Sequence, residues 1–205
     1  MTKDNDISIK GADKVYKNLK SIMKHLGQEY SIKIGIIGEQ ASQTHKDSGL
    51  NNASLGAIHE FGVTVKVTEK MRKYLNYLGI HLRKDTTEIE IPQRSFLAGT
   101  LLNSKVSDYI YSAADLEGSD LSLDKLIAED KSASDSGYME KLANIVGAKA
   151  LEMVQTAFST GGYPDKWQAI SEATRKNRTG DPNNPPLTDT GDLRDSITFE
   201  VKKVK

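Results

Sequence analysis

The triplet Asp189-Thr190-Gly191 matches the pattern that carries the catalytic carboxylate of aspartic peptidases. That mechanism needs two carboxylates that share one proton, in surroundings shielded enough to separate their pKa values. The chain contains one such triplet, so a homodimer would have to supply the second. Asp192 and Arg194 place charge beside the triplet, whereas a catalytic pair would lie among apolar residues. The favoured interpretation is a turn that leads into a strand, and a homodimeric aspartic peptidase is the alternative.

Other catalytic patterns are incomplete. His59-Glu60 begins a His-Glu-x-x-His zinc motif, but Val63 stands where the second histidine would be. Ser54 has an asparagine where a nucleophile elbow needs its first glycine. Gly35 and Gly38 lack the third glycine of a dinucleotide-binding loop and the Lys-Ser/Thr ending of a phosphate-binding loop. We therefore predict no enzymatic activity, no metal site and no cofactor.

The composition points to a chain that buries little surface by itself. Of its 205 residues, 37% are hydrophobic, the mean hydropathy is -0.51, and cysteine is absent. The lack of cysteine excludes disulfides and thiolate catalysis. The chain shows no apolar stretch of membrane-spanning length and no signal-peptide pattern, so we expect no membrane partner and production in the cytoplasm. Low apolar content predicts long loops or burial against partner chains.

Charge is balanced overall but separated along the chain. Lys plus Arg and Asp plus Glu both number 28, while residues 66–85 are mainly basic and 115–140 mainly acidic. The two regions are either solvated faces or ends that stack on different partners. The basic region mixes cations with aromatic rings, as single-strand binders do, at Lys70, Arg72, Lys73, Tyr74 and Tyr77. Tyr74 is expected to pack inward, and sequence-independent DNA contact is kept as an alternative function.

Hydrophobic spacing predicts the elements. Intervals of three and four predict helices over residues 12–26, from Asn52 or Ser54 to Phe61, after a Thr68 cap to Leu78, over 95–110 and over 138–158, with a short helix around Trp167 and Ile170. Alternation predicts strands over 31–38, 63–67, 86–91 and 197–202. The polar stretch 39–52 is expected to be a loop. The predicted fold is one α+β domain spanning residues 1–205, with one antiparallel sheet of about four or five short strands packed against two long helices.

Two segments do not fit a compact core. Residues 112–136 are acidic and serine-rich, which predicts an insertion. Residues 161–186 are rich in Gly, Pro and polar residues, which predicts an extended arm that orders on assembly. Trp167 and Ile170 are its expected anchors on a neighbouring chain. On that hypothesis, Trp167→Ala would weaken assembly and leave the melting temperature of the monomer nearly unchanged.

Several separated motifs together resemble one family. They are Ala-Ile-His-Glu-Phe-Gly at 57–62, Ile-Pro-Gln-Arg-Ser-Phe-Leu at 91–97, and Pro-Leu-Thr-Asp-Thr-Gly-Asp-Leu-Arg-Asp-Ser-Ile at 186–197, with Trp167, Thr174 and Lys176 before the last of them. Their order is similar to that in the virion morphogenesis proteins of tailed bacteriophages, also called tail completion, tail terminator or neck proteins. The resemblance covers roughly residues 12–202 without the acidic insertion. Ser95 departs from it mildly, since proline is expected there as often.

The resemblance implies a non-catalytic virion protein that forms a ring, commonly a hexamer, at the head–tail junction after assembly in the host cytoplasm. Its implied partners are other copies of itself, tail tube or sheath proteins, neck or connector proteins, and genomic DNA touched passively in the lumen. The structural motif residues are Phe61, Gly62, Pro92, Arg94, Phe96, Leu187, Thr190, Gly191 and Leu193. The interface candidates are Trp167, Ile170, Arg175, Lys176, Arg178, Lys70, Arg72 and Lys73.

Overall fold

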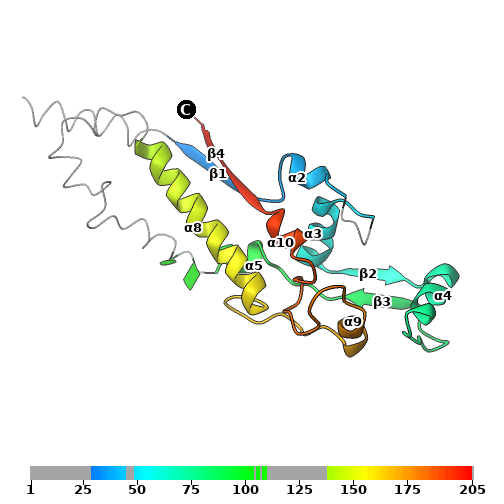
Figure 1. The fold of residues 1–205 in the computed structure, drawn as a ribbon. Helices are drawn as coiled ribbons and strands as arrows, with labels where there is room; N and C mark the ends of the chain where they lie inside the picture. Colours follow the sequence, from blue (N-terminus) through cyan, green and yellow to red (C-terminus); the bar gives the residue numbers. More distant parts are fainter. Residues whose placement is uncertain (1–28, 45–48, 104, 107, 110–137, 205) are drawn as a thin grey trace, which may run out of the picture.

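The computed structural model describes residues 29–44, 49–103, 105–106, 108–109 and 138–204. This part of the chain forms a mixed α+β fold of seven helices and four strands (Figure 1). The predicted helix over 12–26 and the predicted acidic insertion over 112–136 lie outside the described residues.

The first sheet joins the two ends of the described chain. Strand β1 (Tyr30–Gly35) pairs antiparallel with strand β4 (Thr198–Lys203). Ile34 lies opposite Phe199, so apolar side chains from both strands share one face, as the alternation predicted. A sheet of two strands is only marginally stable by itself in water, so this sheet depends on a helix to cover its apolar face.

Helix α8 (Tyr138–Thr160) covers that face and is the longest described helix, at 23 residues (Figure 1). Its close approach depends on Gly147, because a Cβ at that position would overlap the ring of Phe199. A long, periodic helix ending before Gly161 is what the sequence predicted. No helix in the described part of the chain combines the length and the apolar content needed to cross a membrane.

The second sheet forms an arm that reaches away from α8. Strand β2 (Val63–Lys66) pairs antiparallel with strand β3 (Glu88–Ile91), and helix α4 (Glu69–Tyr77) lies between them at the tip (Figure 1). The hydroxyl of Thr68 accepts a hydrogen bond from the N–H of Met71 at 3.1 Å, which is the predicted N-cap. We call residues 63–91 the hairpin arm.

The prediction of one sheet with four or five strands is wrong for the described residues. They form two separate antiparallel sheets of two strands each, β1 with β4 and β2 with β3. Alternation of apolar and polar residues reports which side of a strand is covered, but it does not specify the partner strand. The α+β class itself is confirmed.

Helix α3 (Asn52–Phe61) begins one residue earlier than its predicted caps allow. The side chain of Asn51 accepts a 2.7 Å hydrogen bond from the N–H of Ser54, so Asn51 is the cap, and neither Asn52 nor Ser54 fills that role. The helix ends at Gly62, whose φ of 71° suits glycine. The end of α3 is therefore placed as predicted, and the end matters most for the site below.

Four shorter helices complete the described elements. The segment predicted as a loop contains α2 (Glu39–Ser42). The helix predicted over 95–110 is present in part, as the turn of α5 (Ala98–Leu101) and as helical residues at 105–106 and 108–109. Helix α10 (Asp192–Asp195) precedes β4. Helix α9 (Glu172–Lys176) begins after Ser171, whose hydroxyl caps it. The short helix predicted around Trp167 and Ile170 is thus displaced toward the C-terminus, because the serine cap and not the apolar pair marks its start.

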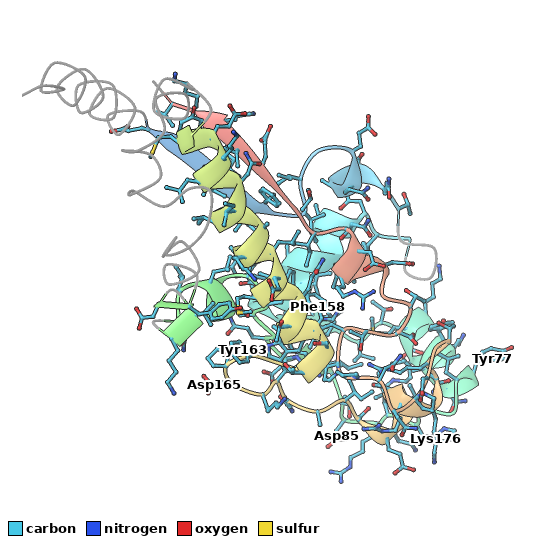
Figure 2. All side chains as sticks on the ribbon, turned by 60° about the vertical axis from the view of Figure 1, so that its left-hand side comes forward. Tyr77, Asp85, Phe158, Tyr163, Asp165 and Lys176 are labelled. Atoms are coloured by element: carbon cyan, nitrogen blue, oxygen red, sulfur yellow. The ribbon has the colours of Figure 1, made fainter. Side chains whose placement is uncertain are left out.

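The core lies where α3, α5, α8 and α10 meet. Its buried members are Phe96, Val154, Phe158, Leu193 and Ile197. The rings of Phe96 and Phe158 are tilted by 59° with their centroids 5.1 Å apart. Figure 2 shows Phe158 near the C-terminal end of α8 and Tyr77 far away at the tip of the hairpin arm. Two distant sequence motifs, 91–97 and 186–197, therefore share one core.

Candidate functional site

A buried carboxylate joins the end of α3 to the start of α5. Glu60 is 6% exposed, and its Oε1 accepts hydrogen bonds from the hydroxyl of Ser95 at 2.6 Å and the N–H of Ala98 at 2.9 Å. Its Oε2 accepts from the N–H groups of Phe96 at 2.8 Å and Leu97 at 3.0 Å. These N–H groups lie at the start of α5 or just before it, where the helix offers them no partner. Glu60 therefore fixes the segment after β3 against α3.

That segment carries Arg94 into the interior. Arg94 is 6% exposed; its backbone N–H donates to the carbonyl of His59 at 2.7 Å, and its Nε donates to the carbonyl of Gln168 at 3.1 Å. The described residues give the Arg94 guanidinium no ion pair and no other hydrogen bond. Burial, and then repulsion from Arg178, lowers the pKa of Arg94. Arg94 is thus a buried cation without an adjacent carboxylate.

The loop after α8 folds back against the core. The N–H of Trp167 donates to the carbonyl of Gly161 at 2.8 Å, and its indole meets the ring of Phe158 edge-on with centroids 5.6 Å apart. Trp167 therefore packs on its own chain and is not free as an anchor. The preceding Gly162 has a φ of 111°, and a Cβ there would overlap the carbonyl of Asp165, so the turn requires glycine.

Two charged residues close the same loop. The guanidinium of Arg178 donates to the carbonyls of Asn184 at 2.5 Å and Pro185 at 2.8 Å. The carboxylate of Asp189 accepts from the N–H of Gly180 at 2.7 Å. Burial lowers the pKa of Arg178, and the charge of Asp189 acts in the opposite direction. The charges of Arg178 and Asp189 therefore offset each other while both side chains bind the loop backbone.

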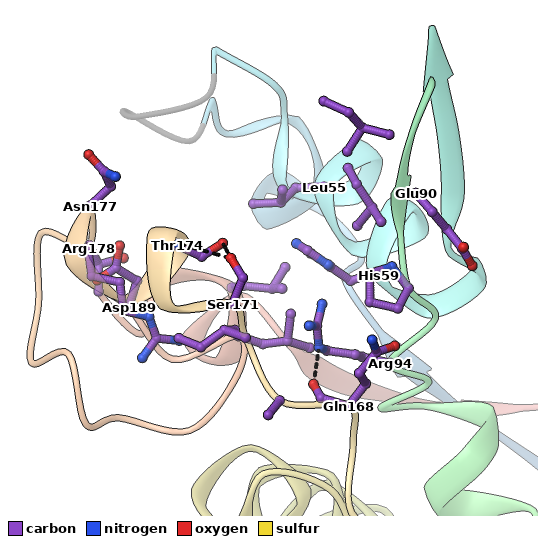
Figure 3. Close-up of a pocket in the computed structure, with 18 of the residues that line it drawn as sticks. Leu55, His59, Glu90, Arg94, Gln168, Ser171, Thr174, Asn177, Arg178 and Asp189 are labelled. Atoms are coloured by element: carbon purple, nitrogen blue, oxygen red, sulfur yellow. Dashed lines mark hydrogen bonds between the residues drawn. The ribbon is translucent and has the colours of Figure 1, made fainter. Parts of the chain in front are cut away.

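A cleft of about 700 Å³ lies between this loop, the hairpin arm and α3. Figure 3 shows Arg94, Arg178 and Asp189 at its edge and base, with His59 and Leu55 on the side of α3. The apolar part of its wall comes from all three elements. The lining residues are Leu55, His59, Ile80, Ile89, Glu90, Ile91, Pro92, Arg94, Gln168, Ala169, Ile170, Ser171, Thr174, Asn177, Arg178, Leu187, Asp189, Thr190, Gly191 and Leu193. We call this space the Arg94 cleft.

His59 lines the Arg94 cleft as a neutral imidazole. Burial, and then the charge of Arg94, lowers the pKa of His59 from 6.5 to about 4. Its Nδ1 is buried and has no hydrogen-bond partner among the described residues. An uncharged ring is favoured there because a second cation beside Arg94 would have no counter-charge.

The tip of the hairpin arm presents a second polar surface. Lys70, Lys73, Tyr74 and Tyr77 are spaced by three and four residues, so they follow one face of α4, and all four are exposed. The prediction that Tyr74 packs inward is wrong, since it is 61% exposed and Tyr77 is 85% exposed. Arg72 is different, because it donates to the carbonyls of Arg83 and Thr86 and so holds the arm together. We call Lys70, Lys73, Tyr74 and Tyr77 the α4 stripe.

The remaining interface candidates lie around the loop. Ile170 lines the Arg94 cleft. Arg175 donates to the carbonyl of Pro182 at 2.8 Å, and Lys176 forms an exposed ion pair with Glu172 at 2.9 Å. The eight interface candidates are therefore divided between the cleft, the loop and the hairpin arm.

The structural motif residues mostly shape backbone close to the cleft. A Cβ at Gly62 would lie 2.9 Å from the backbone nitrogen of Gln93, so glycine permits the contact between the first two motifs. Pro92 and Leu187 line the cleft. Phe61, another structural motif residue, stays out of the core, since it is 74% exposed. A helix-end position beside Gly62 directs its ring outward.

The last motif builds the entry to α10. Leu193 is buried in the core, and Gly191 is the N-cap of α10 with a φ of 90°. Thr190 is exposed but lines the cleft. Around Asp189 the triplet thus forms the turn that the sequence favoured, with the carboxylate bound to its own loop.

Comparisons with known proteins were made at the level of sequence and of structure. No family model matches this chain. Comparison with curated proteins and comparison with solved structures also give no match.

Sequence reasoning missed the two groups that organise the site. The sequence analysis placed Glu60 in an incomplete zinc motif and in the first motif of the resemblance, and Arg94 in the second motif, without assigning either a structural role. A weak signal was present for Glu60, since it follows Asn52 and Gly56 at intervals of four and so lies on the same side of α3 as these two buried residues. No local signal shows that Arg94 lacks a carboxylate partner, because that depends on residues as distant as Gln168.

Proposed function

We propose that this protein is a structural subunit of a tailed-bacteriophage virion, forming a ring at the head–tail junction that completes the tail and joins it to the neck. The proposal starts from the resemblance of the separated motifs. It is supported by their meeting in space: Glu60 binds residues 95–98, Arg94 binds Gln168, and Leu193 packs in the core with Phe96. Because these contacts join motifs that are far apart in the sequence, the motifs form one structural unit, and this supports treating them together as the basis of the resemblance.

The hairpin arm is the observation that carries the assembly part of the proposal. In the described residues each of the four strands pairs on one side only, so both sheets offer unpaired edges. A two-stranded sheet is marginal in water unless another element completes it. The arm extends from the body with α4 at its tip, and α9 reaches it through the hydrogen bond from Asn177 to the carbonyl of Leu78 (Figure 1). Addition of a strand or helix from a neighbouring copy would satisfy these edges.

Exposed apolar side chains add to this argument. Phe61 is 74% exposed at the base of the arm, and Leu102 is 83% exposed at the end of α5. Large exposed apolar side chains favour contact with other protein surfaces, in this case other copies, tail tube or sheath proteins, and neck or connector proteins. The function proposed is therefore non-catalytic and depends on assembly.

Negative-stain imaging and mass photometry of the purified protein, alone and with tail tubes, test the proposal. We expect closed rings, and we expect Phe61→Ser to reduce their number while circular dichroism stays unchanged. Gln155→Ala, an exposed change on α8 away from both sheet edges, serves as the control and should leave ring formation intact. A protein that stays monomeric at all concentrations and never joins tubes or virions contradicts the proposal.

A second function, sequence-independent contact with DNA, is favoured by the α4 stripe. Exposed lysines and tyrosines on one helical face combine phosphate attraction with rings on which bases can stack. Removing both charges in Lys70→Gln/Lys73→Gln should reduce the slope of log affinity against log salt by about 1.4 to 1.8 for DNA. The matched control is Lys33→Gln/Lys105→Gln, two exposed lysines away from the arm. Equal slopes for both double variants would rule out the stripe as a DNA contact.

A further inference from the structure

The charge of Arg94 has no partner inside the described chain. A buried guanidinium is costly unless a carboxylate offsets it, and proteins seldom leave one alone. Asp189 also lines the cleft, but its carboxylate accepts hydrogen bonds from Thr179 and Gly180 and opposes the charge of Arg178. Glu90 is exposed on β3 and forms no ion pair with Arg94.

The free part of Arg94 has the shape of a carboxylate receptor. Its Nε is bound to the carbonyl of Gln168, which leaves the two terminal nitrogens without a partner in the described residues. The terminal edge of a guanidinium donates two parallel hydrogen bonds to a planar carboxylate. Because Arg94 lines the cleft, a group entering from outside reaches this edge without displacing an existing bond.

We propose that the Arg94 cleft binds a carboxylate carried by a peptide segment of a partner protein, with Arg94 as the anchoring residue. The cleft volume of about 700 Å³ exceeds what a lone carboxylate fills. Ile89, Ile170 and Leu187 line the remaining space and fit apolar side chains beside the acidic residue. An acidic residue next to an apolar one is therefore the chemistry that the cleft selects.

A phosphate group fits less well. It carries up to two negative charges and three strong acceptor oxygens. Two guanidinium groups and two carboxylates line the cleft, so its formal charge is balanced, but Asp189 offsets Arg178 and Glu90 forms no ion pair with Arg94. Among the described residues, Arg94 is therefore the one cation of the cleft without an adjacent counter-charge. One unopposed charge matches one carboxylate. The proposal concerns a binding site of the single chain and does not depend on ring formation.

An array of immobilised random hexapeptides, blocked at both ends, tests the proposal with the purified full chain. We expect the peptides bound by the wild type to be enriched in Asp or Glu adjacent to an apolar residue, and replacement of that residue by Asn or Gln to weaken binding about tenfold. Arg94→Lys keeps the positive charge but removes the two parallel N–H donors of the guanidinium, and should weaken binding by a similar factor. Arg175→Lys is the matched control, because Arg175 binds Pro182 outside the cleft and should leave binding unchanged.

A spectroscopic measurement keeps the test decisive if Arg94→Lys does not fold. In NMR spectra of the wild type, the Arg94 Nε–H resonance should shift as the most tightly bound acidic peptide is added. It should not shift when that peptide carries Asn or Gln in place of its Asp or Glu. Binding that ignores the carboxylate, or that leaves this resonance unmoved, overturns the proposal. So does a cleft that takes up inorganic phosphate or acetate but none of the peptides, since that outcome identifies a site for small anions.

Discussion

The carboxylate of Glu60 lies 2.8 Å from the backbone N–H of Phe96, although 36 residues separate the two in sequence. The bond is one of four that tie the end of α3 to residues 95–98, which lead into α5. A carboxylate that accepts several N–H bonds replaces the water it loses on burial, and such charge-assisted bonds are stronger than neutral ones. This one side chain therefore holds two of the separated motifs in register.

Glu60→Gln is expected to destabilise the protein by about 2 kcal/mol, because the amide retains one acceptor oxygen and loses the charge that strengthens all four bonds. Urea denaturation followed by circular dichroism measures the change. Glu90→Gln is the control, since Glu90 is exposed and should change stability by less than about 0.5 kcal/mol. Equal stabilities for the two variants would show that Glu60 does not hold the segment.

Trp167→Ala is expected to lower the stability of the isolated chain by about 3 kcal/mol, because the indole packs edge-on against Phe158. The hypothesis of an extended arm at residues 161–186, with Trp167 free as an anchor, predicts instead that the melting temperature of the monomer stays nearly unchanged. Tyr77→Ala provides a comparison of the same kind, since Tyr77 is 85% exposed and its loss should leave the melting temperature nearly unchanged. An unchanged melting temperature for Trp167→Ala would restore the arm hypothesis.

Stability is expected to fall as the pH is lowered from about 6.5 to about 4 because of His59. Its folded pKa of about 4 lies below the unfolded value of 6.5, so the unfolded chain binds more protons in this window and is favoured by acid. The full effect of this one residue approaches about 3 kcal/mol. His59→Gln should flatten the pH dependence measured by urea denaturation, whereas the exposed His81→Gln should not. Parallel curves for wild type and His59→Gln would contradict the prediction.

Gly147→Ala is expected to cost about 2 kcal/mol, since the new methyl group would overlap the Phe199 ring and force α8 away from β4. Adding Phe199→Leu to this variant should recover part of the loss, and the double-mutant cycle gives the coupling. Asn144→Ala tests whether any new alanine on α8 has this effect, since Asn144 is exposed. Additive losses from the two substitutions would exclude the contact.

Local elements were predictable where the chain itself carries their boundaries. Thr68 and Gly62 mark the start of α4 and the end of α3 through hydrogen-bonding and backbone preferences that act within a few residues. The long α8 was predictable because its apolar stripe continues over many turns. These features need no information from elsewhere in the chain.

Pairing and exposure were not predictable in the same way. Val65 and Ile34 both follow strand patterns, yet they belong to different sheets, since the partner of a strand is chosen by tertiary packing. Tyr74 shares a helical side with apolar residues, but the arm offers no core for it to enter, so it stays in solvent. The Arg94 cleft likewise exists only after three distant segments meet.

The pairing of β1 with β4 has a consequence for the rate at which the protein folds. Tyr30 lies opposite Lys203, so this sheet forms only after nearly the whole described chain has been brought into a closed loop. Closing such a loop costs entropy before the first hydrogen bond between β1 and β4 forms. Proteins whose contacts join residues far apart in the sequence fold slowly for this reason. The apolar face of α8 stays exposed to solvent until β1 and β4 have paired. The rate of this pairing therefore sets how long a newly made chain is prone to aggregation.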